Sequence, residues 1–237
     1  MLKKLVVVTF FFFVAGVTIF FGIEKKNNGS VFTNLNITNI KDTIPKVALT
    51  FDDGPSSQYT EKLLDGLKER NVKATFFVMG ESAKENPDII KRMYEEGHLI
   101  GNHTYSHIDL AKTNYNDACK EINDTNTCIK NITGYIPQYI RPPYGDWNKK
   151  LLEETEMSVV LWNVDPEDWK DQYSSVVAAR VMKNTRSGDI ILLHDIFDSS
   201  VEAAFKIIDG LQEKGYQFVT IDRLSNKKII RRSEEEK

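Results

Sequence analysis

The sequence predicts an α/β protein built on a parallel sheet, either barrel-like or doubly wound. From residue 46 onward, about seven short apolar runs alternate with about six segments of helical period. The first run, Val47–Phe51, is almost continuously apolar, as expected for a strand that is buried on both faces. Most of the intervening segments are long enough to return each strand parallel to the one before it.

Each element is assigned from apolar periodicity and from glycine or proline at its ends. Pro87 lies near the first turn of the second helix, and Gly97 lies just past its end. Strands are predicted at residues 47–51, 74–78, 98–101, 139–141, 158–164, 189–193 and 217–221. Helices are predicted at residues 59–69, 87–96, 115–131, 149–156, 174–185 and 201–214.

The N-terminus contains a predicted membrane anchor. Residues 5–23 form an apolar run interrupted only by Thr and Gly, and as a helix it covers about 28 Å, close to the ~30 Å thickness of a bilayer's hydrocarbon core. Lys3 and Lys4 precede it, so residues 1–4 are expected in the cytoplasm and the remainder outside the cell. A cleaved signal peptide, followed by secretion, is the alternative. The apolar run is long for a signal peptide and no Ala-x-Ala site follows it, so we expect a single-pass anchor in the cell membrane.

Two polar segments flank the expected domain at residues 45–225. Residues 24–44 are rich in Asn and Thr and have no regular period, which indicates a tether of about 25 Å as a coil. Residues 226–237 read as a charged, frayed tail. The chain carries 31 basic and 34 acidic residues, a net charge of −3, and no long basic run. This composition argues against nucleic acid as a partner.

Chemically active side chains follow several of the predicted strands. In βα folds the carboxyl ends of the strands meet at one mouth, so we expect these side chains to form one site. Each feature is weak alone, because Asp-Gly-Pro is ordinary turn chemistry and a single histidine after a strand is usually a core residue. Three of the four histidines are nevertheless among them. The residues are Asp52, Asp53, His103, His107, Arg141, Asp165, Asp168 and His194.

This set of side chains suits one kind of chemistry. Two imidazoles and one carboxylate make a three-ligand set with open positions, which is typical of a catalytic metal. Such a metal lowers the pKa of water and polarises a carbonyl. A second carboxylate is then available as a general base, a nearby arginine would keep it ionised, and a further histidine could protonate a leaving group. The residue types therefore indicate metal-assisted hydrolysis of an amide or ester.

Five motifs in the chain resemble those of the polysaccharide deacetylase family, the NodB-homology group of carbohydrate esterase family 4. They occur in the family's order, and the resemblance covers about residues 44–224. It implies a distorted (β/α) barrel of about seven parallel strands. The motifs are Thr50-Phe51-Asp52-Asp53-Gly54-Pro55, His103-Thr104-x-x-His107, Arg141-Pro142-Pro143-Tyr144, Asp165-x-x-Asp168-Trp169 and Leu192-x-His194.

The first three motifs imply a base and a metal site. By resemblance, Asp52 would be the general base and Arg141 would orient it. The divalent metal would be zinc, with cobalt as the alternative. Its ligands would be Asp53, His103 and His107.

The remaining motif residues imply an acid and a substrate pocket. By resemblance, His194 would be the general acid, tuned by Asp168. The backbone N–H of Tyr144 would stabilise the oxyanion. Two further residues would wall the pocket for the acetyl methyl group, and a third would contact the substrate. These are Trp169, Leu192 and Pro143.

The motifs do not choose among acetylated glycans, but an anchor and a short tether favour a cell-wall polysaccharide. We therefore expect removal of N-acetyl groups from N-acetylglucosamine residues of bacterial peptidoglycan by a monomeric enzyme. A chitooligosaccharide deacetylase, or an O-acetyl esterase of another surface polysaccharide, is the alternative within this class. An inactive glycan-binding module is the alternative from a different class. It is disfavoured because it would not need a complete acid, base and metal set.

Overall fold

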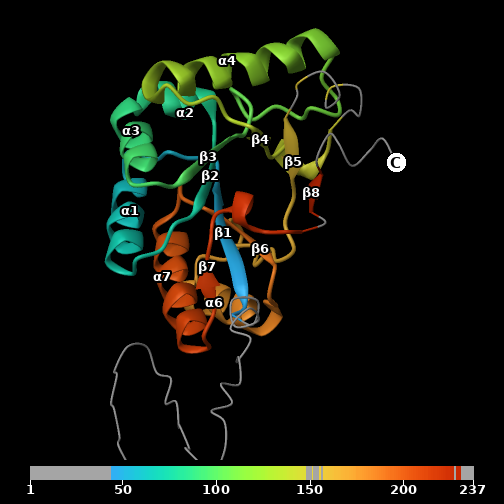
Figure 1. The fold of residues 1–237 in the computed structure, drawn as a ribbon. Coiled ribbons are helices and arrows are strands. Elements are labelled where there is room, and N and C mark those ends of the chain that lie inside the picture. The colour runs from blue at the N-terminus through green and yellow to red at the C-terminus, as the bar shows by residue number, and fades with distance from the viewer. Residues whose placement is uncertain (1–43, 148–150, 152–154, 156, 227, 231–237) are drawn as a thin grey trace, which may run out of the picture. The chain divides into compact units, whose positions relative to one another are not determined.

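A computed structural model describes residues 44–147, 151, 155, 157–226 and 228–230 (Figure 1). All of them belong to one of two units of the chain, residues 39–237. The expected anchor at residues 5–23 and all but the last residue of the tether lie outside the described residues. Within the part that is described, no helix is long and apolar enough to cross a membrane.

A single curled sheet is the centre of this unit. Its strand order is β6-β1-β2-β3-β4-β5-β8, and β7 pairs with the start of β1. All pairings are parallel except that of β5 with β8, which confirms the predicted parallel α/β sheet. The strands are β1 (Lys46–Asp52), β2 (Thr75–Val78), β3 (Leu99–Asn102), β4 (Tyr139–Ile140), β5 (Ser158–Val160), β6 (Ile190–His194), β7 (Gln217–Phe218) and β8 (Ile229–Ile230).

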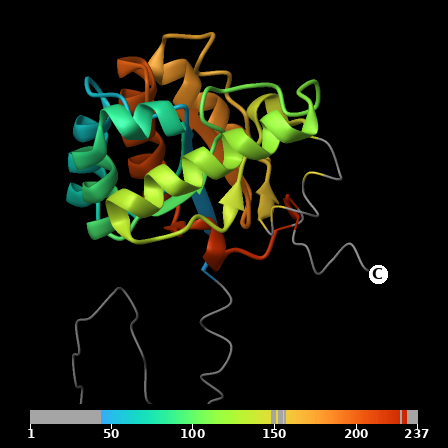
Figure 2. The ribbon, with the colours of Figure 1, turned by 90° about the horizontal axis from the view of Figure 1, so that it is seen from above.

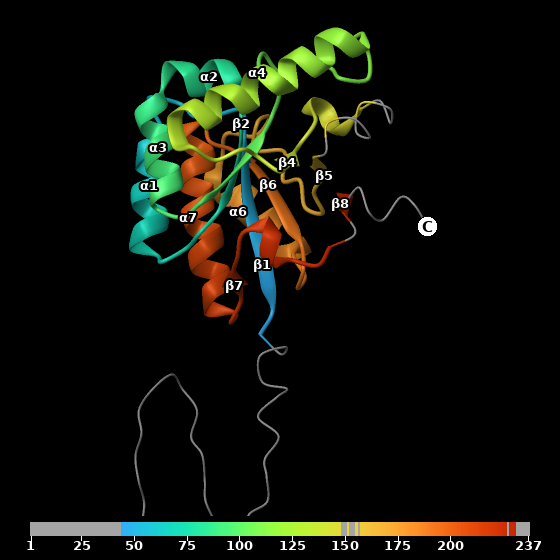
Figure 3. The ribbon, with the colours of Figure 1, turned by 45° about the horizontal axis from the view of Figure 1, so that its top comes forward.

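Helices cover one face of the sheet. Figures 1 and 3 show α1, α3 and α7 side by side against the sheet, and Figure 2 shows α4 crossing the molecule when it is seen from above. The short helix α2 was not predicted, and most of the predicted helix at residues 149–156 lies outside the described residues. The helices are α1 (Thr60–Glu69), α2 (Gly80–Glu85), α3 (Pro87–Glu95), α4 (Tyr115–Thr133), α6 (Ser174–Asn184) and α7 (Asp198–Glu213), with 3₁₀ turns η2 (Pro143–Gly145) and η3 (Ile221–Arg223).

The fifth strand is shorter than predicted. β5 ends at Val160, and the chain rejoins the sheet only at Val164, through an isolated parallel bridge to β6. The guanidinium of Arg141 explains the interruption, because it donates hydrogen bonds to the carbonyls of Val160 and Leu161, at 3.2 and 3.3 Å. This bridge brings the segment that follows β5 back to β6, so the sheet is strongly curled.

Alternate residues of β1 face two different environments. Val47, Leu49 and Phe51 pack in the main core against the helices. Ala48 faces the opposite, inner side, where it belongs to a second apolar cluster. Because side chains alternate along a strand, the next inward residues are polar ones at positions 50 and 52. The inner face of β1 therefore changes from apolar to polar toward its carboxyl end.

The C-terminal segment closes the inner side of the sheet. Ile221, Leu224 and Ile229 pack into the inner cluster, and β8 pairs antiparallel with β5. β8 therefore lies inside the segment that we expected to be a charged tail. Ile229 is buried, so burial of apolar surface explains why the chain remains in the fold beyond residue 225.

Candidate active site

The ends of β1 and β6 place two motifs next to each other. Asp52 is the last residue of β1, and its register partner in β6 is His194. The following residue, Asp53, has a φ of 73°, which is rare for a residue with a side chain. Among the residues that the structure describes, all but one of the non-glycine residues with positive φ lie in the five motifs, and such backbone strain is concentrated at functional sites. They are Asp53, Thr104, His107, Tyr144 and Glu167, with Asn71 as the exception.

Three motif side chains converge on one point. Oδ1 of Asp53 lies 3.3 Å from Nε2 of His103 and 3.4 Å from Nε2 of His107. Their ligand atoms all lie within 4.8 Å of one another. Oδ1 of Asp53 is buried and has no hydrogen-bond partner among the described residues. A buried, unpaired carboxylate oxygen facing two imidazoles fits a divalent metal, and this donor set suits zinc.

The protonation states of these groups also fit a metal. Nδ1 of His103 donates to the carbonyl oxygen of Arg141 at 2.6 Å, so Nε2 carries the lone pair that a metal needs. Burial would raise the pKa of Asp53, but the adjacent His103 and the other nearby imidazoles lower it overall. Burial and the neighbouring His103 lower the pKa of His107. These shifts favour an ionised carboxylate and a neutral imidazole, which are the forms that bind metals.

The two histidines lie on a loop after β3, not on a helix. Side chains outside the motifs hold this loop. Oδ1 of Asn102, which is fully buried, accepts from the N–H of Thr104 at 2.8 Å. The Glu121 carboxylate on α4 accepts from the N–H groups of Tyr105 and Ser106 at 2.9 and 2.8 Å. The sequence prediction did not include either residue. Glu121 lies 16 and 15 positions from the groups that it holds, so no local pattern marks it. Asn102 lies two positions before Thr104, and this short-range asparagine turn beside the motif is a signal that could have found it.

Arg141 fixes the other carboxylate of the pair. It is fully buried on the inner side of the sheet, and Nη1 donates to Oδ1 of Asp52 at 2.7 Å and to the hydroxyl of Thr50 at 2.8 Å. The guanidinium also lies 4.2 Å above the ring of Phe77. Oδ2 of Asp52 is directed toward the metal-binding group, 3.8 Å from Nε2 of His103. One oxygen of Asp52 is thus held, and the other is available for proton transfer.

His194 is held by a second buried carboxylate. Its Nδ1 donates to Oδ1 of Asp168 at 2.8 Å, and its backbone N–H donates to Oδ2 at 2.9 Å. The hydroxyl of Ser200 on α7 also donates to Oδ2, at 2.6 Å. Burial alone would lower the pKa of His194, but the hydrogen bond and charge of Asp168 raise it to about 9. His194 is therefore able to carry a proton at neutral pH, as a general acid must.

The other motif residues line the rim or the inner face. Leu192 is buried two residues before His194 and faces the same side of β6. Pro143 is buried in η2, while Tyr144 is 69% exposed and packs edge-to-face on His107, with 5.0 Å between ring centroids. Trp169 is 54% exposed.

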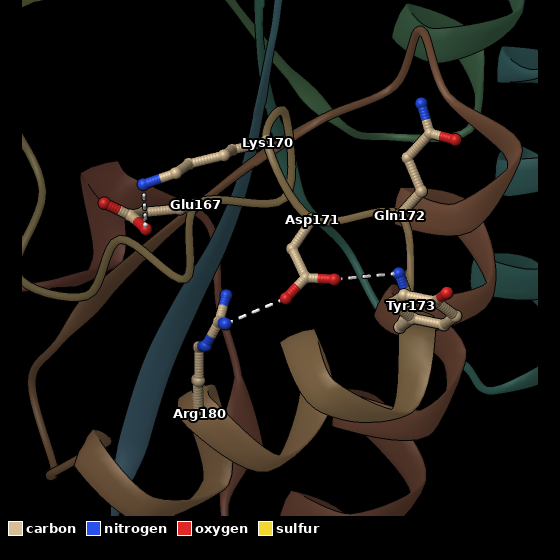
Figure 4. Close-up of a pocket in the computed structure, with 6 residues that line it drawn as sticks. All are labelled: Glu167, Lys170, Asp171, Gln172, Tyr173 and Arg180. Atoms are coloured by element: carbon tan, nitrogen blue, oxygen red, sulfur yellow. Dashed lines mark hydrogen bonds and ion pairs between the residues drawn. The ribbon is translucent and has the colours of Figure 1, made fainter.

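Asp165 belongs to a turn at this rim, and the turn leads into an open hollow. The Asp165 carboxylate accepts from the N–H of Glu167 at 2.8 Å. The hollow has a volume of about 630 Å³. Figure 4 shows the ion pair between Arg180 of α6 and Asp171, in which Nη2 donates to Oδ2 at 2.8 Å. Tyr173 lines the same hollow and is 76% exposed. The lining residues are Glu167, Lys170, Asp171, Gln172, Tyr173 and Arg180.

Comparison with known proteins agrees with this geometry. A family model described as polysaccharide deacetylase matches residues 39–158. The chain belongs to the polysaccharide deacetylase family. The expectation drawn from the five motifs is confirmed at this level, and the curled, parallel-stranded sheet is the fold shared with solved members of the family.

Three members illustrate the similarity. Peptidoglycan-N-acetylmuramic acid deacetylase PdaC of Bacillus subtilis is 45% identical over 182 residues, which are 77% of this chain and 39% of PdaC. A solved structure of PdaC has a TM-score of 0.75 at 44% identity and covers 76% of this chain and 90% of that one. A peptidoglycan-N-acetylglucosamine deacetylase of Bacillus cereus is 45% identical over 183 residues, 74% of this chain and 66% of the relative. This chain thus spans less than half the length of PdaC.

The third member has a bound metal. The structure of a family 4 acetyl xylan esterase from Clostridium thermocellum in complex with a cobalt ion has a TM-score of 0.70 at 38% identity. The match covers 74% of this chain and 88% of the esterase chain. Deacetylases of this family are metal-dependent, and the group formed by Asp53, His103 and His107 is the metal-binding candidate in this chain.

Proposed function

We propose that this protein removes N-acetyl groups from N-acetylglucosamine residues of a cell-wall polysaccharide, peptidoglycan, by metal-dependent hydrolysis. The observation that carries the proposal is the meeting of three parts at the carboxyl ends of β1, β3 and β6. They are a three-ligand metal group, a carboxylate held by an arginine, and a histidine held by a carboxylate. Membership of the deacetylase family and the relatives named for peptidoglycan support it.

Asp53, His103 and His107 would hold a divalent metal, for which we propose zinc, with cobalt as the alternative. When bound, such a metal supplies Lewis-acid polarisation of the acetyl carbonyl and lowers the pKa of water. Asp52 accepts the proton of the attacking water through Oδ2, because its Oδ1 is engaged by Arg141.

The remaining groups stabilise charge and complete the proton transfer. The backbone N–H of Tyr144, a residue of the strained turn η2, donates to the developing oxyanion in this proposal. His194 gives its proton, from Nε2, to the leaving nitrogen as the carbon–nitrogen bond breaks. Asp168 accepts from Nδ1 throughout, which holds the tautomer and stabilises the imidazolium. One proton leaves the water for Asp52 and one reaches the amine from His194.

The role of His194 as general acid can be distinguished from the roles of the other site residues by a change of leaving group. An amine must be protonated as it departs, whereas a nitrophenolate is a stable anion that leaves without a proton. We therefore expect His194→Ala to reduce kcat/KM on an N-acetylated sugar by about 10²-fold or more beyond its effect on nitrophenyl acetate. The measurement is the mutant to wild-type ratio of kcat/KM on the two substrates.

Asp168→Asn is the companion variant, and it should show the same bias in weaker form, because Asp168 acts only through the imidazole. Ser200→Ala removes one of the three hydrogen bonds to Asp168 and should show a still smaller bias. Equal losses of kcat/KM on both substrates in His194→Ala would contradict the role of general acid.

The two peptidoglycan relatives are named for different sugars, N-acetylmuramic acid and N-acetylglucosamine. Exposed rings at the rim, those of Tyr144, Trp169 and Tyr173, offer flat faces for the sugars of an extended glycan. A chitooligosaccharide deacetylase, or an O-acetyl esterase of another surface polysaccharide, remains the alternative, because the same groups would serve an acetyl ester.

A direct assay tests the function. The purified protein, loaded with zinc, is incubated with peptidoglycan, chitooligosaccharides and acetylated xylan, and released acetate is measured. Mass spectrometry of the digested peptidoglycan then locates the free amine on one of its two sugars. We expect release from peptidoglycan at N-acetylglucosamine. Acetate from the ester alone would indicate an esterase, and metal-loaded protein that releases no acetate would indicate a binding module.

We also propose that residues 5–23 anchor the protein in the cell membrane, with residues 24–44 as a tether that presents the domain at residues 45–225 on the outer face. The apolar run and the two preceding lysines support this arrangement. We expect the protein in the membrane fraction, and we expect protease added outside wall-stripped cells to remove the domain. Recovery of an active fragment beginning near residue 24 in the medium would instead support a cleaved signal peptide.

A further inference from the structure

A buried carboxyl group lies directly behind the proposed site. Asp195 follows His194 at the end of β6 and is only 1% exposed. Its Oδ2 accepts a hydrogen bond from the hydroxyl of Thr60 at 2.5 Å. The same hydroxyl accepts from the backbone N–H of Ser56 at 2.7 Å. This series of hydrogen bonds connects the residue after β6 to the loop that follows β1, and its step from Asp195 to Thr60 spans 135 positions of the sequence.

The loop also rests directly on this carboxyl group. A Cβ atom added to Gly54 would lie 2.2 Å from Oδ1 of Asp195 and 2.5 Å from its Cγ. Only glycine permits such a close approach, because any other residue would displace the loop or the carboxyl group. Gly54 directly follows Asp53, so a displacement here would move the proposed metal ligand.

The opposite side of the loop is held by the segment after β2. The backbone N–H of Met79 donates to the carbonyl of Gly54 at 3.1 Å, and the hydroxyl of Ser82 donates to the carbonyl of Asp53 at 3.4 Å. The loop is therefore fixed from two sides. On the β6 side, the contacts come from Asp195 and Thr60.

Asp195 has no access to a substrate, and nothing in the proposed mechanism uses it. Its second oxygen, Oδ1, has no hydrogen-bond partner among the described residues. Burial raises the pKa of Asp195 to about 7. Burying a carboxyl group costs free energy unless its oxygens are hydrogen-bonded. The carboxylate of Asp195 accepts from the hydroxyl of Thr60, and this hydroxyl in turn accepts from the loop that follows β1.

We propose that Asp195, acting through Thr60, is a positioning residue that holds the loop carrying Asp52 and Asp53. It thereby sets the affinity of the Asp53, His103 and His107 site for its metal. Asp195 directly follows His194, the proposed acid, in the sequence. It therefore also fixes the position of the loop that carries Asp52 and Asp53 relative to His194. The inference rests on the proposed function for its catalytic consequence, whereas its effect on metal binding is measurable without any substrate.

A pair of threonine variants tests this proposal. Thr60→Val removes the linking hydroxyl, and Thr75→Val is the matched control. Thr75 is also fully buried, and its hydroxyl also accepts a backbone N–H, that of Ile221, but it lies at the start of β2, away from the loop. Zinc affinity is measured on the full-length chain by competition with a coloured chelator, and Tm is measured in parallel.

We expect both variants to lower Tm and only Thr60→Val to weaken zinc binding, by about 10-fold, a typical effect of losing a group that supports a metal ligand. Equal zinc losses in the two variants would mean that the hydroxyl serves general stability, which would overturn the proposal. Unchanged zinc affinity in folded Thr60→Val would also overturn it.

Substitutions of Asp195 decide the question independently if Thr60→Val does not fold. Asp195→Asn keeps an oxygen that accepts from Thr60, whereas Asp195→Ala does not. We expect Asp195→Asn to retain more zinc affinity than Asp195→Ala, and equal affinities at the wild-type value would contradict the proposal. A wild-type protein that binds zinc but releases no acetate would refute the proposed function alone. A wild-type protein that binds no zinc would refute both.

Discussion

Replacing His103 or His107 with alanine is expected to remove the bound metal and to reduce deacetylation below detection. Each imidazole contributes one of the three candidate ligand atoms, which lie within 4.8 Å of one another. The loss of one nitrogen leaves two donors, too few for a tightly held catalytic metal. The measurements are the metal content of the purified variants by mass spectrometry and acetate release from peptidoglycan.

The fourth histidine provides the control for this experiment. His98 is buried, and its Nδ1 accepts from the N–H of Ala74 at 3.1 Å. Burial lowers its pKa to about 4, so it is neutral, as a core residue should be. His98→Asn keeps an acceptor at this position and should retain the metal and the activity, whatever its effect on Tm. Full activity of metal-free protein after exhaustive chelation would refute the metal requirement.

The two adjacent carboxylates are expected to respond differently to substitution. Asp52→Asn should leave the metal bound and reduce kcat by about 10²–10⁴-fold, the usual contribution of a general base. An amide oxygen still accepts from Arg141 but cannot take a proton from water. Asp53→Ala should instead remove the metal, because Oδ1 of Asp53 faces both imidazoles.

Metal content, kcat and Tm measured together separate these outcomes. Tm is needed because Arg141 is fully buried and loses its charged partner in Asp52→Asn. Thr50→Val removes another acceptor of the same guanidinium nitrogen and leaves the carboxylate intact. It therefore shows how far a disturbance of Arg141 alone lowers kcat and Tm. Loss of metal from Asp52→Asn together with its retention in Asp53→Ala would reverse the two assignments.

Local sequence patterns were sufficient for most of the fold. Apolar periodicity predicted α1, α3, α4 and α6 to within two residues at each end, because these helices bury one continuous face. It failed where an element depends on a distant partner. β5 ends where the guanidinium of Arg141 donates hydrogen bonds to the carbonyls of Val160 and Leu161. α2 begins at Gly80, where a Cβ would lie 2.3 Å from the ring of Tyr105, a contact that no local pattern contains.

The sequence also determined the family and the candidate residues of the site. Motifs of fixed spacing at strand ends are local features, and parallel strands must bring their carboxyl ends to one edge. The different surroundings of Asp52 and Asp53 are not a local feature. They arise because a φ of 73° at Asp53 turns it toward the imidazoles, while Asp52 stays in the strand and faces Arg141.

Only the tertiary structure decided which other residues support this site. Glu121, Ser200 and Asp195 lie 16, 32 and 135 positions from the residues that they hold, whereas the contact of Asn102 with Thr104 spans only 2 positions. Hydrogen bonds and burial depend on distances in the folded chain and not on separation in the sequence. A serine or an acid outside a motif is therefore indistinguishable from a surface residue until the fold encloses it.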